Sequence, residues 1–200
     1  MKNLIILLFC SLPMMGQTVL PIYPRTNYGQ TNVYYKDSNN VYDLFVGTWT
    51  FTEGDISFTI TLGKKSELAE DDYFEDVLVG GYKYSVNGVV LVNTLSLLQN
   101  NYSSSSKYTI FGSYIMGPNH PWCTNCNPDT RVAILSFWEP DRDVWFMAPR
   151  MSFERADAGG VQKLKVVFET TATASPTSLD HEPEYSSYTI PFGTYMLTKQ

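Results

Sequence analysis

The chain has 200 residues, of which 44% are hydrophobic and only 17% are charged, and its formal net charge is −6. This length suits one domain, and the apolar content is enough for a core, which excludes a wholly disordered chain. An acidic chain without a Lys/Arg cluster cannot neutralise phosphates, so nucleic acid is excluded as a partner and anionic membrane surfaces are disfavoured.

Residues 1–16 are typical of a secretory signal peptide. Lys2 gives a basic start, and the apolar run Leu4–Leu12 is too short to cross a bilayer as a helix. A lipoprotein would need Cys10 as the acylated residue, but the residue before it is bulky. We expect cleavage between Gly16 and Gln17, a secreted or periplasmic protein, and no integral membrane segment in the mature chain.

Residues 17–42 are rich in Tyr, Pro and Asn and show neither helical nor strand periodicity. We expect a tyrosine-rich extended leader, whose tyrosines either lie against the wall of the domain or line its mouth. The rest of the chain, residues 43–200, is predicted to be a single domain.

Two strands are predicted at residues 44–52 and 55–62. In the first, Trp49 and Phe51 share one face, while threonines alternate on the other. The second repeats the alternation, with Phe58 on its apolar face. This period of two is typical of half-buried antiparallel strands. Gly63 should end the second strand, and residues 66–72 should form a solvated acidic loop, since they lack the spacing of a calcium-binding loop.

A hairpin is predicted around Asn87-Gly88, which suits a two-residue turn with positive φ at both positions. Tyr82 and Tyr84 lie on its first strand, and residues 89–93 form its second. Gly80-Gly81 upstream should mark a bulge or a bend.

Further strands are expected at residues 107–115, 131–138, 143–149, 162–171 and 188–198. No long helical pattern separates them. The sequence therefore predicts an all-β fold, an antiparallel meander of about nine strands. A closed or nearly closed barrel is favoured, because long apolar strands would otherwise leave exposed edges.

Several segments resemble an uncharacterised family, a domain of unknown function found in secreted proteins of Bacteroidota. The matching segments are Tyr34–Asp37, Phe45–Trp49, Glu75–Gly80, Asn87-Gly88, Cys123–Cys126 and Thr189–Pro191. This resemblance implies a compartment and a size but no activity. Separately, Gly47-Thr48-Trp49 is similar to the Gly-x-Trp opening of lipocalin-like (calycin) barrels, which implies a lipocalin-like barrel.

Cys123 and Cys126 are the only cysteines of the predicted mature chain. In an oxidising compartment a disulfide between them is the first expectation. His120 makes a His-x-x-Cys-x-x-Cys cluster, so a zinc site is the alternative, with Asp129 or His181 as a fourth ligand. A thioredoxin-type redox motif is disfavoured because no helix is predicted after the cysteines.

No catalytic constellation is evident. The chain has two histidines, both in predicted loops, and no Gly-x-Ser-x-Gly motif. We expect a protein that is not an enzyme and that uses no cofactor.

A binding function is the better expectation, with a small apolar or amphipathic ligand enclosed in the barrel mouth. The candidate lining residues are inward aromatic side chains: Trp49, Phe51, Phe58, Tyr82, Tyr84, Trp138 and Trp145. For each of them the competing interpretation is the stronger one, because an inward aromatic side chain on a strand usually just fills the core. The alternative is a protein- or glycan-interaction module without a ligand cavity.

Overall fold

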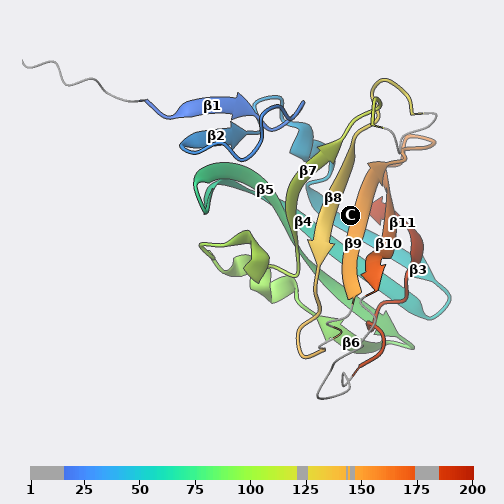
Figure 1. Ribbon diagram of the computed structural model, residues 1–200. Helices are drawn as coiled ribbons and strands as arrows, with labels where there is room; N and C mark the ends of the chain where they lie inside the picture. The colour runs from blue at the N-terminus through green and yellow to red at the C-terminus, as the bar shows by residue number, and fades with distance from the viewer. Residues whose placement is uncertain (1–15, 121–125, 143, 145–146, 174–184) are drawn as a thin grey trace, which may run out of the picture.

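The computed structural model describes residues 16–120, 126–142, 144, 147–173 and 185–200 (Figure 1). Its strands are β1 (Thr18–Pro21), β2 (Val33–Lys36), β3 (Gly47–Glu53), β4 (Ile56–Glu70), β5 (Tyr73–Val86), β6 (Val89–Asn93), β7 (Ile110–Met116), β8 (Val132–Phe137), β9 (Met147–Arg155), β10 (Lys163–Thr173) and β11 (Gly193–Lys199). Three short 3₁₀ helices accompany them: η1 (Val41–Leu44), η2 (Leu95–Gln99) and η3 (Ser105–Lys107).

Eight of the strands form a closed antiparallel barrel. Neighbours follow the order β5-β4-β3-β11-β10-β9-β8-β7, and β7 pairs with β5 to close the ring. Apart from β6, which pairs with β5 outside the ring, this is an up-and-down meander in chain order. The predicted all-β meander and the closed barrel are confirmed, with eight barrel strands and three additional ones.

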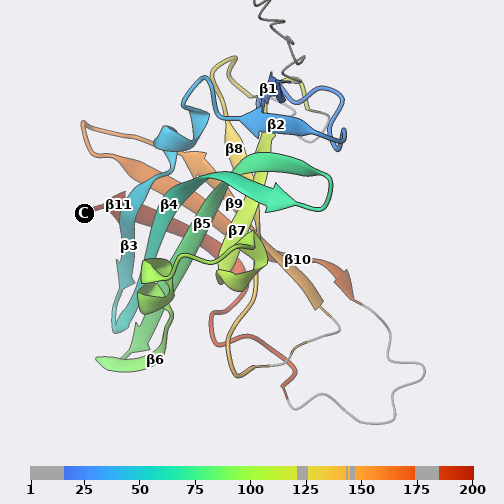
Figure 2. The same cartoon turned by 90° about the vertical axis from the view of Figure 1, so that its left-hand side faces the viewer.

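The barrel has two unlike ends, which Figures 1 and 2 show in two views. The leader end carries β1, β2 and η1. The loop end carries β6, the β3–β4 turn and the described residues that follow β8 and precede β11. Strand directions follow from the antiparallel order, so each barrel strand runs between these two ends.

The β3–β4 pair shows why the threonine pattern folds as it does. Thr48 lies opposite Thr61 and Thr50 opposite Thr59, and the hydroxyl oxygens of each pair are 3.0 and 3.1 Å apart. The alternate residue Trp49 is fully buried in the core. The predicted alternation, with aromatic side chains inward and hydroxyls outward, is confirmed.

Strand β4 continues beyond the predicted stop at Gly63 and runs to Glu70. The acidic segment predicted as a loop is therefore mostly strand, paired with the start of β5. The register shifts between Lys65 and Leu68, and Glu67 adopts a φ of 55° there. The Glu67 amide donates 3.1 Å to the carboxylate of Asp76, so a buried partner on β5 offsets the cost of the irregularity.

Gly80-Gly81 marks a close approach between backbones. The β4–β5 register is continuous at both glycines, so the predicted bulge is absent from this pair of strands. A Cβ on Gly81 would lie 2.8 Å from the carbonyl oxygen of Thr94, and one on Gly80 would lie 2.7 Å from Leu62. At this point β5 changes partner from β7 to β6, which requires small residues.

The leader contributes to the sheet. β1 pairs with β2, and β2 pairs with the start of β5, both in parallel. Tyr35 and Tyr42 are fully buried and belong to the main core. These two leader tyrosines therefore pack against the barrel at its leader end. The sequence left open whether the leader tyrosines lie against the domain or line its mouth, and the structure shows these two packed against it.

Candidate functional site

The barrel interior is filled by its own side chains over the residues that the structure describes. Four predicted lining residues, Trp49, Phe58, Tyr82 and Tyr84, are at most 4% exposed and belong to one core cluster. The ring of Phe58 lies edge-on to both tyrosines, with centroids 6.4 and 6.0 Å away. Eight-stranded barrels have an interior just wide enough for side chains to fill. The ends of the barrel are therefore the places to look for a site.

The other predicted lining residues lie elsewhere. Phe51 is half-buried and packs edge-on against Tyr195, with ring centroids 5.3 Å apart. Trp138 follows the inward-facing Phe137, and its indole N–H donates 2.7 Å to the Tyr108 carbonyl oxygen. Trp145 lies outside the described residues.

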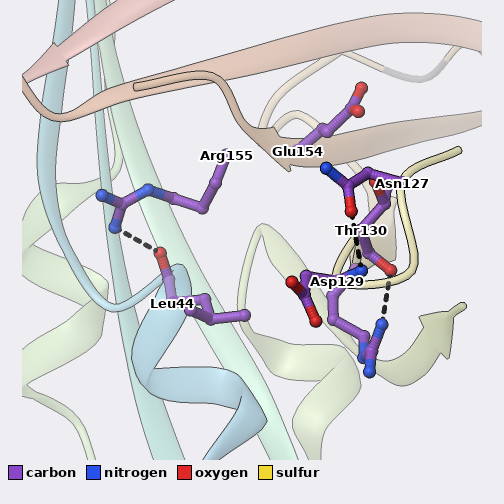
Figure 3. Close-up of a pocket in the computed structure, with 7 residues that line it drawn as sticks. Leu44, Asn127, Asp129, Thr130, Glu154 and Arg155 are labelled. Atoms are coloured by element: carbon purple, nitrogen blue, oxygen red, sulfur yellow. Dashed lines mark hydrogen bonds between the residues drawn. The ribbon is translucent and has the colours of Figure 1, made fainter. Parts of the chain in front are cut away.

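One pocket of about 210 Å³ lies at the leader end (Figure 3). Its lining residues are Leu44, Asn127, Asp129, Thr130, Arg131, Glu154 and Arg155. The two guanidinium groups here already have partners. Arg155 donates 3.0 Å to the Leu44 carbonyl oxygen, and Arg131 donates to the carbonyl oxygens of Pro128 and Thr130. These contacts tie η1 and the 127–130 turn to the barrel, so we interpret this pocket as structural.

Two buried carboxylates hold the leader to the barrel. Asp76 accepts hydrogen bonds from the Tyr34 hydroxyl at 2.6 Å and from the Asp37 amide at 2.9 Å. Asp37 accepts from the amides of Val41 and Tyr42, at 2.7 and 3.1 Å, and so caps η1. Both carboxylates thus meet fixed donors, as buried charges require.

Glu75 makes a second connection to the leader. It accepts a hydrogen bond of 2.8 Å from the Tyr28 hydroxyl, and the Arg25 guanidinium lies 3.8 Å away. That guanidinium also stacks over the Tyr28 ring at 3.8 Å and donates to Ser113. Burial raises the pKa of the Glu75 carboxyl above its ordinary value, although the hydrogen bonds from Ser113 and Tyr28 and the charge of Arg25 oppose the shift.

A pocket of about 340 Å³ lies at the loop end and combines apolar and charged walls. We call it the loop-end pocket. Its lining residues are Leu91, Val92, Asn93, Thr94, Glu139, Pro140, Asp141, Arg142, Tyr185 and Thr189. The apolar wall comes from β6, where Leu91 is 52% exposed, and the charged wall comes from the segment after β8. Such a volume is near the lower limit of small-molecule sites.

The hydroxyl of Tyr82 is a buried polar group of the barrel interior and is not part of the lining of this pocket. Tyr82 is fully buried, and its hydroxyl has no hydrogen-bond partner among the residues that the structure describes. Burial raises its pKa well above the ordinary value, and the charge of Glu139 raises it further while Arg142 opposes. Two residues that line the pocket thus act on this hydroxyl. A buried donor without a partner costs free energy, so a bound water, a ligand or a strained position is expected at this hydroxyl.

A short segment before β11 lies across the loop end, and we call residues 187–190 the strap. Glu139, which is 6% exposed, accepts hydrogen bonds from the amide of Thr189 at 2.8 Å and from its hydroxyl. Arg142 donates 2.9 Å to the Ser187 carbonyl oxygen and lies 3.5 Å from the Glu139 carboxylate. The ring of Tyr188 packs 5.4 Å from that of Phe137. The strap thus closes the interior beside the pocket.

No functional site was predicted from the sequence at any of these charged residues. Glu139, Asp141 and Arg142 lie between the strands predicted at residues 131–138 and 143–149, and Thr189 belongs to a segment that carries the family resemblance. A buried glutamate after a strand gives no local signal, because its partner Thr189 is 50 residues away.

The cysteine cluster falls only partly within the described residues. Cys126 and His120 are described, whereas Cys123 is not. Among the described residues, no group of three or more His, Cys, Asp or Glu side chains is placed to hold a metal ion. The disulfide and its zinc alternative both stay predictions. No helix in the described part of the chain is long and apolar enough to cross a membrane.

The fold and the site define a closed eight-stranded antiparallel β-barrel protein with a mixed apolar and charged pocket at one end. The chain belongs to DUF6705, a family of unknown function, which it matches over residues 1–200. The expected membership of an uncharacterised family is thus confirmed. No curated protein and no solved structure matches the chain.

Proposed function

We propose that this chain is a secreted, non-enzymatic binding protein that takes up a small amphipathic ligand at the loop end of the barrel. The observation that carries the proposal is the loop-end pocket of about 340 Å³, which has one apolar and one charged wall. The half-exposed Leu91 on one wall and the charged side chains on the other suit a molecule with apolar and polar parts, which supports binding over a purely structural role.

The packed interior limits where a ligand can bind. Because Trp49, Phe58 and their neighbours occupy the described interior, the ligand sits at the mouth, beside the strap, rather than along the barrel axis. Signal cleavage and export remain parts of the proposal that rest on residues 1–16.

Native mass spectrometry of protein exported from its own kind of host tests this function. We expect an added mass that dissociates as a small organic molecule. Leu91→Arg should fill the loop-end pocket and remove the adduct. The control Val161→Arg changes another exposed apolar residue, 43% exposed, in the turn between β9 and β10 at the leader end. A clean apo mass for the wild-type protein, or an adduct retained by Leu91→Arg, would contradict the proposal.

An interaction module is the second candidate, and β6 favours it. Val89, Val90 and Leu91 are 60%, 48% and 52% exposed on a strand that pairs only with β5 among the described strands. Exposed apolar side chains in a row mark interaction surfaces. Val90→Lys should then abolish co-purification of a partner protein while leaving any small-molecule adduct in place. An adduct lost with Val90→Lys would argue against this candidate.

A further inference from the structure

We infer that the ligand of the loop-end pocket is a short extended peptide with a basic residue, which adds to the free edge of β6. This inference rests on the proposed function and names the class of ligand for the same pocket. It follows from the way β6 lines the pocket, from the direction of its main-chain groups and from a carboxylate on the opposite wall.

The pocket lies along the edge of β6 rather than over one of its faces. Four consecutive residues at the end of β6 and just after it line the pocket: Leu91, Val92, Asn93 and Thr94. Successive side chains of a strand point to opposite faces of its sheet, so a pocket over one face would meet only alternate residues. Among the described strands β6 pairs with β5 alone, which leaves its other edge open at the loop end (Figure 2).

Asn93 presents its main chain to this open edge. The amide of Thr94 donates 2.7 Å to the Tyr82 carbonyl oxygen, so the main chain of Thr94 faces β5. Main-chain groups alternate in direction along a strand, and those of Asn93 therefore face away from β5. None of the described strands pairs with them there. An extended peptide can accept a hydrogen bond from the Asn93 amide and donate one to its carbonyl oxygen, as in β-strand addition.

A bulge limits how much chain can pair with this edge. Tyr84 lies opposite Val92 and Ser85 opposite Val90, so Leu91 is an extra residue without a partner on β5. Such a bulge interrupts the edge and opposes pairing with a long strand. The pocket volume of about 340 Å³ likewise admits a few residues of a chain rather than a folded partner.

The opposite wall supplies a charge that favours a basic residue. Asp141 is exposed and lines the pocket, and it forms no ion pair with any residue that the structure describes. Its neighbour Arg142 instead lies 3.5 Å from Glu139 and donates to the Ser187 carbonyl oxygen. The carboxylate of Asp141 is thus available to a Lys or Arg of the peptide. A second copy of this chain is disfavoured as the occupant, because β6 has no basic residue and both copies are acidic.

The apolar surface beside the edge fits a second residue of the peptide. Leu91 is 52% exposed, and Pro140 lines the same pocket. An apolar side chain that covers Leu91 removes both surfaces from water, and this burial adds to the main-chain hydrogen bonds. The main chain of Asn93 and the side chain of Leu91 thus provide affinity, and Asp141 provides the preference for a basic residue.

Fluorescence polarisation with three peptides that carry the same N-terminal dye tests this inference at pH 7 and about 0.15 M salt. The first is Thr-Val-Lys-Val-Thr-amide, the second has its three central amides N-methylated, and the third has Glu in place of Lys. We expect N-methylation to weaken binding about tenfold, because it removes a main-chain hydrogen bond. The Glu peptide should bind a few-fold more weakly than the Lys peptide, because its carboxylate meets Asp141.

Three variants place the binding in the pocket. Leu91→Arg should abolish binding of the Lys peptide, and the control Val161→Arg at the leader end should leave it unchanged. Asp141→Asn should fold, because Asp141 is exposed and Asn tolerates its φ of 60°. We expect this variant to reduce the difference between the Lys and Glu peptides by about half or more.

The outcomes separate this inference from the proposed function. Equal binding of the N-methylated peptide overturns strand addition, and equal or tighter binding of the Glu peptide overturns the basic class. No binding of the Lys peptide overturns the whole inference. A non-peptide adduct on the exported protein that Leu91→Arg removes also overturns it but keeps the binding function, whereas a clean apo mass contradicts the proposed function itself.

Discussion

The guanidinium of Arg155 lies 5.2 Å from the centre of the Trp49 ring and also donates 3.0 Å to the Leu44 carbonyl oxygen. One side chain of β9 thus joins the first barrel strand to the last residue of η1. Arg155 also pairs with Asp157, and this hydrogen bond lowers the pKa of that carboxyl. This contact ties η1 to the barrel at its leader end.

Replacing this arginine should weaken the fold. Arg155→Met keeps much of the packing but loses the cation–π contact and the charged hydrogen bond to Leu44. We expect the free energy of unfolding to fall by about 2 kcal/mol, measured by urea denaturation. Arg150→Met, on the same strand, breaks an ion pair with the partly exposed Glu169 and should cost less than about 1 kcal/mol. Equal losses for the two variants would show that the contact with Trp49 and Leu44 adds nothing.

The carboxylate of Asp76 should be hard to replace. It accepts three hydrogen bonds, from Tyr34, Asp37 and Glu67, and is 2% exposed. Asp76→Asn turns an NH₂ group toward these hydrogen-bond donors. We therefore expect the free energy of unfolding to fall by about 3 kcal/mol. Asp43→Asn is the control, because its side chain is 65% exposed and 3.6 Å from Lys64. A loss below about 1 kcal/mol for Asp76→Asn would contradict this account.

The sequence predicted the fold class because the barrel strands obey a simple period. The β3–β4 alternation and the Asn87-Gly88 turn carry their own local chemistry, so they could be found without tertiary information. The end of β4 could not: the acidic residues 66–70 form a strand only because β5 supplies pairing and Asp76 supplies an acceptor. Likewise, β2 pairs in parallel with a strand about 40 residues away, which local patterns do not encode.

Only part of the candidate site could be predicted from the sequence. Tyr82 was predicted to face inward, which its periodicity gives and the structure shows. That its hydroxyl has no partner among the described residues, and that the charges of Glu139 and Arg142 act on its pKa, depends on the path of the chain far from Tyr82 in sequence. Such long-range juxtapositions of single polar residues have no sequence pattern.

The buried carboxyl of Glu75 predicts a pH effect. Its pKa is raised in the folded protein above the ordinary value of 4.5, so the folded state binds the proton more tightly than the unfolded state. The stability that this group contributes is therefore present below about pH 4.5 and is lost as the pH rises through the folded pKa.

Glu75→Gln removes this titration while keeping an acceptor for Tyr28. From pH 4 to pH 7 the free energy of unfolding of the variant should rise relative to that of the wild type. Urea denaturation of both proteins at each pH measures this difference. Glu53→Gln, at an exposed position, should leave the curve unchanged. If this difference stays constant across the range for Glu75→Gln, the charge of Arg25 cancels the effect of burial on the pKa of Glu75.

A disulfide between Cys123 and Cys126 would change the mass of the exported protein in a predictable way. If Cys123 and Cys126 are bridged, the denatured mass of exported protein should match residues 17–200 and lie about two daltons below the fully reduced value, because the bridge removes two hydrogens. Cys126→Ser should abolish this difference. A reduced pair with a zinc-sized adduct under native conditions would instead favour ligation by His120 and the two thiolates.

The hydroxyl of Tyr82 predicts a stabilising substitution. Without a ligand it is a buried donor that no described residue satisfies, so Tyr82→Phe removes a cost and preserves the shape of the ring. We expect the ligand-free variant to be more stable than the wild type by about 1 kcal/mol in urea denaturation. Tyr42→Phe is the matched control, because the Tyr42 hydroxyl is also buried but donates to the carbonyl oxygens of Asp76 and Ser113, at 3.1 and 2.9 Å. That variant should lose about 1 to 2 kcal/mol. A stabilised Tyr82→Phe would mean that the fold bears the cost of an unsatisfied donor, whereas a destabilised one would mean that the hydroxyl serves the fold.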